Sequence, residues 1–264
     1  MKISIVIPSF NQGIYLEETI KTILNQDYPN LELILIDGES TDNTINIIKK
    51  YEKYFKYWVS EKDSGQSNAI NKGLKFASGE IFAWQNSDDR YLPGTFKYIS
   101  EVFLNKKNID VIFGGWNFIN EKGEKISTRT LKRFNVMKLR AGFNIPPQPT
   151  VFFRKSSIER VGGLNELKNQ VMDYDLYIKI INNDNVFITD RILGEFRIHS
   201  ASKTISGKKE QIKELKETRK ELLKCEAGLN EKLFWIYSDA SESLKDYLHS
   251  KLNIFSIRDL FRRK

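Results

Sequence analysis

The sequence predicts an α/β protein with a mostly parallel, doubly wound sheet, and two features of the chain support this fold class. Short apolar runs alternate with amphipathic stretches of helical period, at the spacing of βαβ units. Each of the first apolar runs also stops at a small polar segment, as strands do at the carboxyl edge of an open sheet. At 264 residues the chain is long enough to bury a full core.

The first half of the chain contains the clearest strand and helix signals. The apolar run Ile3–Ile7 is expected to be a buried strand, and Gly13–Gln26 places its apolar residues at helical spacing. Thr41 or Asp42 is a suitable N-cap for a second helix. The other elements expected in this half are a strand at 31–36, a strand at 58–60, a helix ending at 77 and a strand at 81–84.

Polar segments follow these strands, and right-handed crossovers would bring them to one edge of the sheet, around one crevice. They are Pro8–Asn11, Asp37–Asp42, Glu61–Gln66 and Asn86–Asp89. The last of them ends in two adjacent carboxylates, which repel each other unless a cation compensates their charge. Such oxygens can hold Mg²⁺ or Mn²⁺, the usual companions of a diphosphate. A solvated turn that caps the helix after Pro93 is the alternative that these residues alone allow.

The second half of the chain is less regular. Its expected elements are a strand-turn-strand unit at 116–126, a proline-rich structured loop at 141–150, a strand at 151–153, a helix through 176–181 and strands at 186–188 and 193–199. From Gly207 onward the pattern is helical and highly charged. We therefore expect the sheet to continue into this half, and a helical extension to follow it.

Composition excludes several classes of protein. Hydrophobic residues make up 40% of the chain and charged residues 29%, as in ordinary globular proteins. The net charge of +8 favours an anionic partner, but there is no nucleic-acid-binding signature, so we expect no nucleic acid. The single cysteine, Cys225, cannot form an internal disulfide, and neither a signal peptide nor a membrane-spanning run is recognisable. These features favour the cytoplasm.

The expected strand ends contain no glycine-rich phosphate loop. Neither G-x-G-x-x-G nor G-x-x-x-x-G-K-[ST] occurs after the first strand. A phosphate group bound at this edge would need another source of positive charge, and a metal ion is the natural one.

Six segments of the chain, taken in order, resemble one protein family. They are SIVIPSFNQ, DGESTDNT, SEKDSGQSNAINKG, GEIFAWQNSDD, MDYDLYIKI and RIHSASKT. Over about residues 1–205 they look like family 2 glycosyltransferases with the GT-A fold, the kind that build bacterial capsule, exopolysaccharide or lipopolysaccharide chains. The resemblance implies a nucleotide-sugar-binding half at 1–115, an acceptor-binding half at 116–205 and a helical C-terminal extension at 206–264.

The resemblance also implies roles for individual residues of the donor site. The nucleotide would be held by the first two strand ends, at Pro8, Ser9, Asn11 and Asp37, with Asp37 on the base. Asp88 would contact the ribose, Asp89 would ligate the metal, and His199 would lie near the metal or diphosphate. Weaker candidates outside these positions are Gln66, Asn71 and Gln148 as donor or acceptor contacts, and Lys72 and Arg197 as diphosphate contacts. A surface lysine and a structural ion pair are the alternatives for the last two.

The family's catalytic base lies in an acidic pair beside a helix of the acceptor half, which corresponds to Asp173. Met172 stands where the family commonly has Glu, so the base could instead be Asp175, whose other expected role is to cap the helix. Glu39, which separates Gly38 from Ser40, is a second departure from the commoner spacing. The chemistry needs a cation to stabilise the departing diphosphate and a base on the opposite face of the sugar.

We therefore expect an inverting glycosyltransferase, dependent on Mn²⁺ or Mg²⁺, that moves a sugar from a UDP-sugar to a growing glycan or lipid-linked acceptor. The alternative from another class is a non-catalytic nucleotide-sugar-binding or scaffold protein with the same fold. Leu252–Lys264 combines apolar with basic residues, a composition that suits the anionic inner face of a membrane. A tail that docks on protein is the alternative for this segment.

Overall fold

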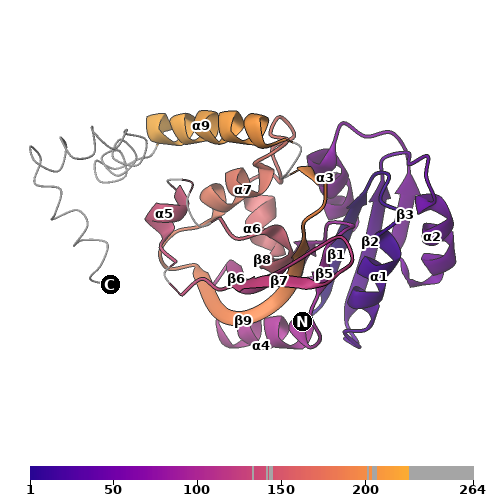
Figure 1. The fold of residues 1–264 in the computed structure, drawn as a ribbon. Helices are drawn as coiled ribbons and strands as arrows, with labels where there is room; N and C mark the ends of the chain where they lie inside the picture. The colour runs from indigo at the N-terminus through magenta and orange to yellow at the C-terminus, as the bar shows by residue number, and fades with distance from the viewer. Residues whose placement is uncertain (133, 141, 143–144, 201, 204–206, 226–264) are drawn as a thin grey trace, which may run out of the picture.

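A computed structural model gives the fold and describes residues 1–132, 134–140, 142, 145–200, 202–203 and 207–225 (Figure 1). A nine-stranded sheet runs through these residues in the order β3-β2-β1-β4-β8-β6-β9-β5, with β7 paired to β6. The predicted α/β class is confirmed. The first half of the chain contributes β1 to β4, and most of the remaining strands come from the second half.

The first half of the chain forms the parallel part of the sheet. β1 lies between β2 and β4, β3 lies outside β2, and all of these pairs are parallel. The elements of this half are β1 (Ile3–Ser9), α1 (Leu16–Leu24), β2 (Leu31–Asp37), α2 (Thr44–Tyr51), the 3-10 helix η1 (Glu52–Tyr54), β3 (Tyr57–Ser60), α3 (Gln66–Phe76), β4 (Ile81–Trp84), β5 (Arg90–Tyr91) and α4 (Thr95–Asn105). Because β1 to β4 are parallel, their carboxyl ends meet at the same edge.

Helices cover both faces of the sheet. Ile3, Ile5 and Ile7 of β1 belong to a core with buried residues of α1, α2 and α4. Val6 points to the opposite face, into a core with α3, α6 (Lys155–Arg160) and α7 (Met172–Ile180). A Cβ on Gly73 of α3 would lie 2.5 Å from Val6, so this close approach of helix to strand requires glycine.

The second half of the sheet is organised around β6 (Val111–Ile119). It pairs antiparallel with β7 (Lys125–Arg129) and β8 (Val151–Arg154), and parallel with β9 (Val186–Arg197). β9 is one curved strand where the sequence predicted two, because the exposed polar residues Asp190 and Arg191 interrupt its apolar pattern. It also pairs with β5, which brings its end back to the acidic pair after β4 (Figure 1). The short helices α5 (Val136–Arg140) and η2 (Gln148–Thr150) complete this half.

The start of α7 differs from the prediction. The helix begins at Met172, so Asp173 and Asp175 both lie in its first turn. The expected cap role of Asp175 is wrong, because Val171 occupies the cap position and the Asp175 carboxylate accepts a hydrogen bond from Lys179 at 2.6 Å.

The last described element is α9 (Lys208–Cys225), which agrees with the helical pattern expected after residue 207. In Figure 1 it lies across the same side of the molecule as α7. No helix in the described part of the chain combines the length and the apolar character that crossing a membrane requires. The expected membrane-binding segment, Leu252–Lys264, lies outside the described residues.

Candidate active site

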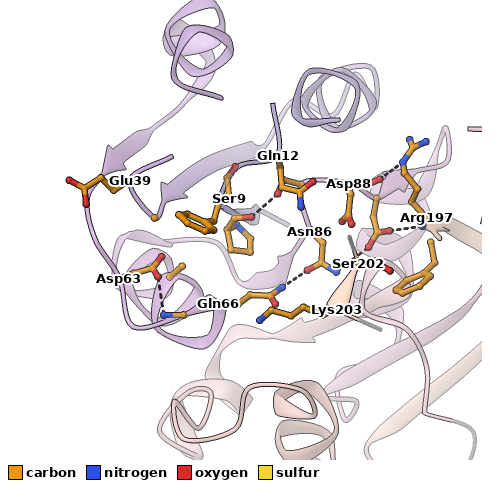
Figure 2. A pocket seen from close by; sticks show the side chains of 18 of the residues that line it. Ser9, Gln12, Glu39, Asp63, Gln66, Asn86, Asp88, Arg197, Ser202 and Lys203 are labelled. Carbon is orange, nitrogen blue, oxygen red and sulfur yellow. Dashed lines mark hydrogen bonds between the residues drawn. The ribbon is translucent and has the colours of Figure 1, made fainter. Parts of the chain in front are cut away.

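A pocket of about 710 Å³ opens at the carboxyl ends of β1 to β4. Residues from each of the four predicted strand-end segments line it, and the end of β9 adds Phe196 and Arg197. The crevice expected from the sequence is therefore present. Figure 2 shows Glu39 and Asp63 toward one end of the pocket and Asp88 and Arg197 toward the other.

Asp37 is fully buried at the end of β2, and serine residues surround its carboxylate. The Ser40 N–H and hydroxyl donate to it at 2.9 and 2.5 Å, and the Ser60 hydroxyl donates at 2.7 Å. Asn11 braces the same loop, since its N–H donates to the Ser40 hydroxyl and its side-chain oxygen accepts from the Thr41 N–H. The structure thus gives both residues a role in shaping the loop that borders the pocket.

Phe10 is the most exposed aromatic side chain of this region, with 60% of its surface accessible, and it lines the pocket. Gly38 lies beside it, where an added Cβ would come within 3.3 Å of the Phe10 ring and 2.9 Å of the Asp63 carboxylate. The next residue, Glu39, has a φ of +67°. Glu39 borders the pocket in this left-handed conformation, and its exposed carboxylate points away from the other lining side chains (Figure 2).

The middle of the pocket is lined by Pro8, Ser9 and Gln66. Gln66 is the first residue of α3, and its amide donates to Asn86 at 2.8 Å (Figure 2). The Ser87 hydroxyl donates to the Pro8 carbonyl at 3.1 Å, which ties the ends of β1 and β4 together. The Ser9 hydroxyl is buried and has no hydrogen-bond partner among the described residues. Three of the predicted donor residues therefore meet here.

The two carboxylates of the acidic pair have different surroundings. Both oxygens of Asp89 are engaged within the protein, by the Arg197 N–H at 2.8 Å and the Asn86 amide at 3.0 Å, and the residue is 1% exposed. Burial and the neighbouring Asp88 charge raise the pKa of Asp89 well above its usual value. Asp88 is less buried, with 17% of its side chain accessible, and contacts His199 at 2.9 Å. Asp88 is thus the carboxylate better placed to meet a ligand.

His199 is fixed against the aromatic ring of Tyr15. The two ring centroids lie 5.0 Å apart, and the Arg197 guanidinium lies over the same tyrosine at 4.6 Å. Tyr15 fits the helical pattern of 13–26, so the sequence marked it as a core residue rather than a site residue. Only the folded chain places it beside a histidine that is 184 residues away.

Arg197 has a structural role. Its side chain donates to the carbonyl groups of Asp88, Asn120 and Glu121, and it forms an ion pair with Glu18. The residue is 2% exposed. These contacts agree with the structural ion pair that was the alternative to a diphosphate contact, and they anchor the end of β9 to the acidic pair.

Two further candidates, Asn71 and Lys72, lie outside the pocket lining. Asn71 binds the backbone of Leu164 through both its amide oxygen and nitrogen, at 2.9 Å each, and also contacts Glu166. Lys72 pairs with Glu61 at 2.7 Å. Both lie on α3 a turn or more beyond Gln66, so the helix carries them away from the pocket edge.

Asp173 lies at the start of α7, separate from the pocket lining described above. Its carboxylate accepts a hydrogen bond from the Tyr174 N–H at 2.8 Å. Burial raises the pKa of Asp173 to about 6, with a contribution from the nearby Glu214 carboxylate. Burial raises the pKa of Tyr177, one turn along the helix, and the charge of the Asp173 carboxylate raises it further. A carboxyl group with a pKa of about 6 is suited to act as a base near neutral pH.

Gln148 of η2 and two tryptophans, Trp84 of β4 and Trp116 of β6, have buried polar atoms outside the pocket lining. Gln148 is 5% exposed, and neither end of its amide has a partner among the described residues. The indole nitrogens of Trp84 and Trp116 are likewise buried without a described partner. Trp84 stacks on Phe153 at a centroid distance of 5.8 Å, so its ring is part of the core.

The sequence argument missed Lys203, which lines the pocket from the segment after β9 (Figure 2). Its ammonium group donates to the Asn169 side chain at 2.9 Å. The segment RIHSASKT contains this lysine, but no local pattern indicates that it reaches the pocket. Among the described residues, no group of three or more His, Cys, Asp and Glu side chains is arranged to hold a metal ion.

Comparison with known proteins agrees with this architecture. The family model described as "Glycosyl transferase family 2" matches residues 4–167. The chain belongs to this family. A curated relative, an uncharacterized glycosyltransferase of Rickettsia conorii, is 30% identical over 243 residues, which cover 86% of this chain and 40% of the relative. The chain thus spans less than half the length of that relative.

Solved glycosyltransferase structures share the fold. Staphylococcus aureus TarS 1-349 in complex with UDP-GlcNAc matches with a TM-score of 0.68 at 20% identity, over 97% of this chain and 78% of that one. The mannosyltransferase PcManGT from Pyrobaculum calidifontis, in complex with GDP-Man and Mn²⁺, matches with a TM-score of 0.61 at 14% identity, over 100% and 88%. The GT-A fold expected from the sequence is confirmed.

Proposed function

We propose that this chain is an inverting glycosyltransferase that moves a sugar from a nucleotide sugar, with a UDP-sugar as the expected donor, to a hydroxyl group. The pocket at the carboxyl ends of β1 to β4 is the observation that carries the proposal. Its volume of about 710 Å³ lies within the range of small-molecule sites. The complexes of TarS with UDP-GlcNAc and of PcManGT with GDP-Man support a nucleotide sugar as the donor.

The nucleoside would occupy the end of the pocket beside β2. Phe10 offers an exposed ring on which a base can stack. Asp37 would accept an N–H of the base, as the family resemblance implies, because serine donors use only three of its roughly four lone-pair positions. The carboxylate is buried, so the loop that follows β2 would have to move for the base to reach it. Asn11 then acts indirectly, because its hydrogen bonds hold the loop at Ser40 and Thr41.

Asp88 and His199 are the residues that would hold a divalent cation. The two side chains lie 2.9 Å apart; Asp88 lines the pocket, and His199 is buried behind it. A carboxylate oxygen suits Mn²⁺ or Mg²⁺, and an imidazole nitrogen is a common ligand of other divalent first-row metals. The donor diphosphate would supply further oxygen ligands, since the described residues contain no group of three or more His, Cys, Asp and Glu side chains arranged for a metal. This assignment gives Asp88 the metal role expected for Asp89, because Asp89 is 1% exposed and Asp88 is the more accessible carboxylate of the pair. When bound, the cation would compensate the charge of the departing diphosphate.

Lys203 would bind the diphosphate from the opposite wall. Its side chain lines the pocket and lies beside Gln66 in Figure 2. Arg197 is close by, but its contacts are within the protein. We therefore propose Lys203, in place of Lys72 and Arg197, as the diphosphate contact.

Asp173 would be the general base. Its carboxylate would accept the proton of the acceptor hydroxyl while the hydroxyl oxygen bonds to the anomeric carbon. The bond from that carbon to the diphosphate oxygen breaks with its electron pair, and the nucleoside diphosphate departs from the opposite face. A single displacement of this kind inverts the anomeric configuration. The raised pKa of Asp173 supports this role.

The proposed acceptor is a growing glycan or a lipid-linked sugar in bacterial surface polysaccharide synthesis. The proposed location is the cytoplasm, at the inner face of a membrane. The net charge of +8 and the apolar and basic residues at 252–264 support a contact with anionic lipid.

A thermal-shift screen of UDP, UDP-sugars and GDP-sugars, with and without Mn²⁺, tests the donor assignment. We expect a UDP-sugar to raise the Tm, and Mn²⁺ to increase the shift, because a ligand that binds only the folded state stabilises it. Product analysis by NMR should then show an inverted anomeric centre. A chain that binds the donor without any turnover, hydrolysis included, would instead support the non-catalytic alternative.

A further inference from the structure

Glu214 of α9 makes three hydrogen bonds to the segment that leads into α7. Its two carboxylate oxygens accept from the backbone N–H groups of Asn169 at 2.9 Å, Gln170 at 2.6 Å and Val171 at 2.9 Å. Val171 is the cap residue of α7, two positions before Asp173. The carboxylate therefore ties down the backbone immediately before the proposed base.

This contact satisfies the Val171 N–H, one of the four N–H groups at the start of α7 that have no partner inside the helix. A helix normally begins with a side chain that caps its first N–H groups, but Val171 has no side chain that can do so. A carboxylate that accepts hydrogen bonds near a helix N-terminus is also favoured by the helix dipole. The family model ends at residue 167, so both the start of α7 and α9 lie beyond the matched region. The position of Asp173 thus depends on a residue of the C-terminal helix.

Glu214 also influences the charge around Asp173. Burial is the main reason that the pKa of Asp173 rises to about 6, and the Glu214 charge raises it further. The other titratable group that interacts with Asp173 within the described residues is Tyr177 of the same helix. Lys203 faces Glu214 and Asp63, and it donates to Asn169, so it neutralises part of the Glu214 charge from the pocket side.

We propose that Glu214 is a positioning residue, which holds the 169–171 backbone so that the Asp173 carboxylate is directed at the acceptor hydroxyl. The inference rests on the proposed role of Asp173 as the base. The proposal gives α9 a role in the acceptor half, whereas the sequence predicted only a helical C-terminal extension.

The test compares Glu214→Gln and Glu214→Asp with the wild type and with Asp173→Asn. Glu214→Gln keeps the size of the side chain but loses one acceptor oxygen and the charge. We expect it to lower kcat at least tenfold with the donor KM within about twofold, and to move the acid limb of the kcat profile to lower pH. Glu214→Asp keeps the charge and shortens the reach, so kcat should fall while the acid limb stays nearer its wild-type position.

Two other glutamates of α9 provide controls. Glu217 is exposed one turn away, and Glu221 pairs with Lys168 without touching the 169–171 backbone. Glu217→Gln and Glu221→Gln should leave kcat within about twofold. If Glu221→Gln loses as much rate as Glu214→Gln, the effect comes from docking of α9 in general and the proposal is wrong.

The remaining outcomes separate this proposal from the assignment of the base. An inactive Asp173→Asn together with a Glu214→Gln variant of unchanged kcat and pH profile would overturn the role of Glu214 alone. An Asp173→Asn variant that keeps its rate would overturn both. If Glu214→Gln does not fold, as judged by its Tm, Glu214→Asp decides the question, and an unchanged kcat in that variant would contradict the proposal.

Discussion

Removal of the Asp173 carboxylate is the sharpest test of the proposed chemistry. Asp173→Asn keeps the shape of the side chain and still accepts the hydrogen bond from the Tyr174 N–H, so the start of α7 should keep its structure. It removes the ability to take a proton from the acceptor hydroxyl. Because Asp173 lies apart from the residues that line the nucleotide pocket, donor affinity should change little.

The expected size of the effect follows from the role and from the pKa. General-base catalysis contributes about 10²–10⁴-fold, so kcat should fall by that factor in Asp173→Asn. In the wild type, the pKa of about 6 means that kcat should fall about tenfold for each pH unit below 6, as the carboxylate becomes protonated. The stability of the folded state therefore changes with pH in the direction opposite to that expected for an acid in an ion pair. Because folding raises this pKa, the folded state loses stability as pH rises toward 6, and Asp173→Asn should not lower the Tm at neutral pH.

The assay is release of nucleoside diphosphate at saturating donor and acceptor, across pH 5–8, with the donor Kd measured separately by calorimetry. Asp175→Asn is the control, since Asp175 pairs with half-exposed Lys179 and its loss should cost at most about 1 kcal/mol of stability and little rate. A wild-type profile that is flat between pH 5 and 7 would contradict the assignment. So would an Asp175→Asn variant that loses the rate while Asp173→Asn keeps it.

Three further predictions concern the donor pocket and the fold. Phe10→Ala should raise the donor KM about tenfold or more, because base–aromatic stacking is worth about 1–3 kcal/mol; an unchanged KM would remove Phe10 from the base site. Asp88→Asn should abolish the Mn²⁺ dependence of donor binding in a thermal-shift assay, and His199→Ala should weaken it; full Mn²⁺ dependence in both variants would exclude this pair as the ligands. Glu32→Gln should reduce the free energy of unfolding in urea at pH 7 by about 2–3 kcal/mol. Burial alone would raise the pKa of Glu32, but hydrogen bonds from Lys56 and Ser4 lower it to about 2, so this stability is present above about pH 4.5 and is lost as pH falls toward 2. A pH-independent loss would refute this account.

The sequence alone determined the parallel half of the sheet and its polar edge. Short apolar strands, helical periods and polar strand ends are local signals, and the parallel geometry then requires the strand ends to meet. The pocket contains Pro8, Ser9, Gln66 and the acidic pair for that reason. The family resemblance supplied what the pattern could not, namely the kind of reaction and the hypothesis that Asp173 is the base.

The tertiary structure decided which side chains face the ligand and which hold the fold. Asp88 and Asp89 are adjacent and chemically identical in the sequence, yet the fold buries Asp89 and leaves Asp88 more accessible. Asp89 accepts hydrogen bonds from Arg197 and Asn86, whereas Asp88 contacts His199. Helical rotation along α3 sends Asn71 and Lys72 away from the pocket that Gln66 borders. The contacts of Lys203 and Glu214 join segments that are far apart in the chain, so no local pattern could reveal them. Local sequence fixes elements and edges, because these depend on neighbours along the chain, whereas the direction of each side chain depends on neighbours that only folding brings near.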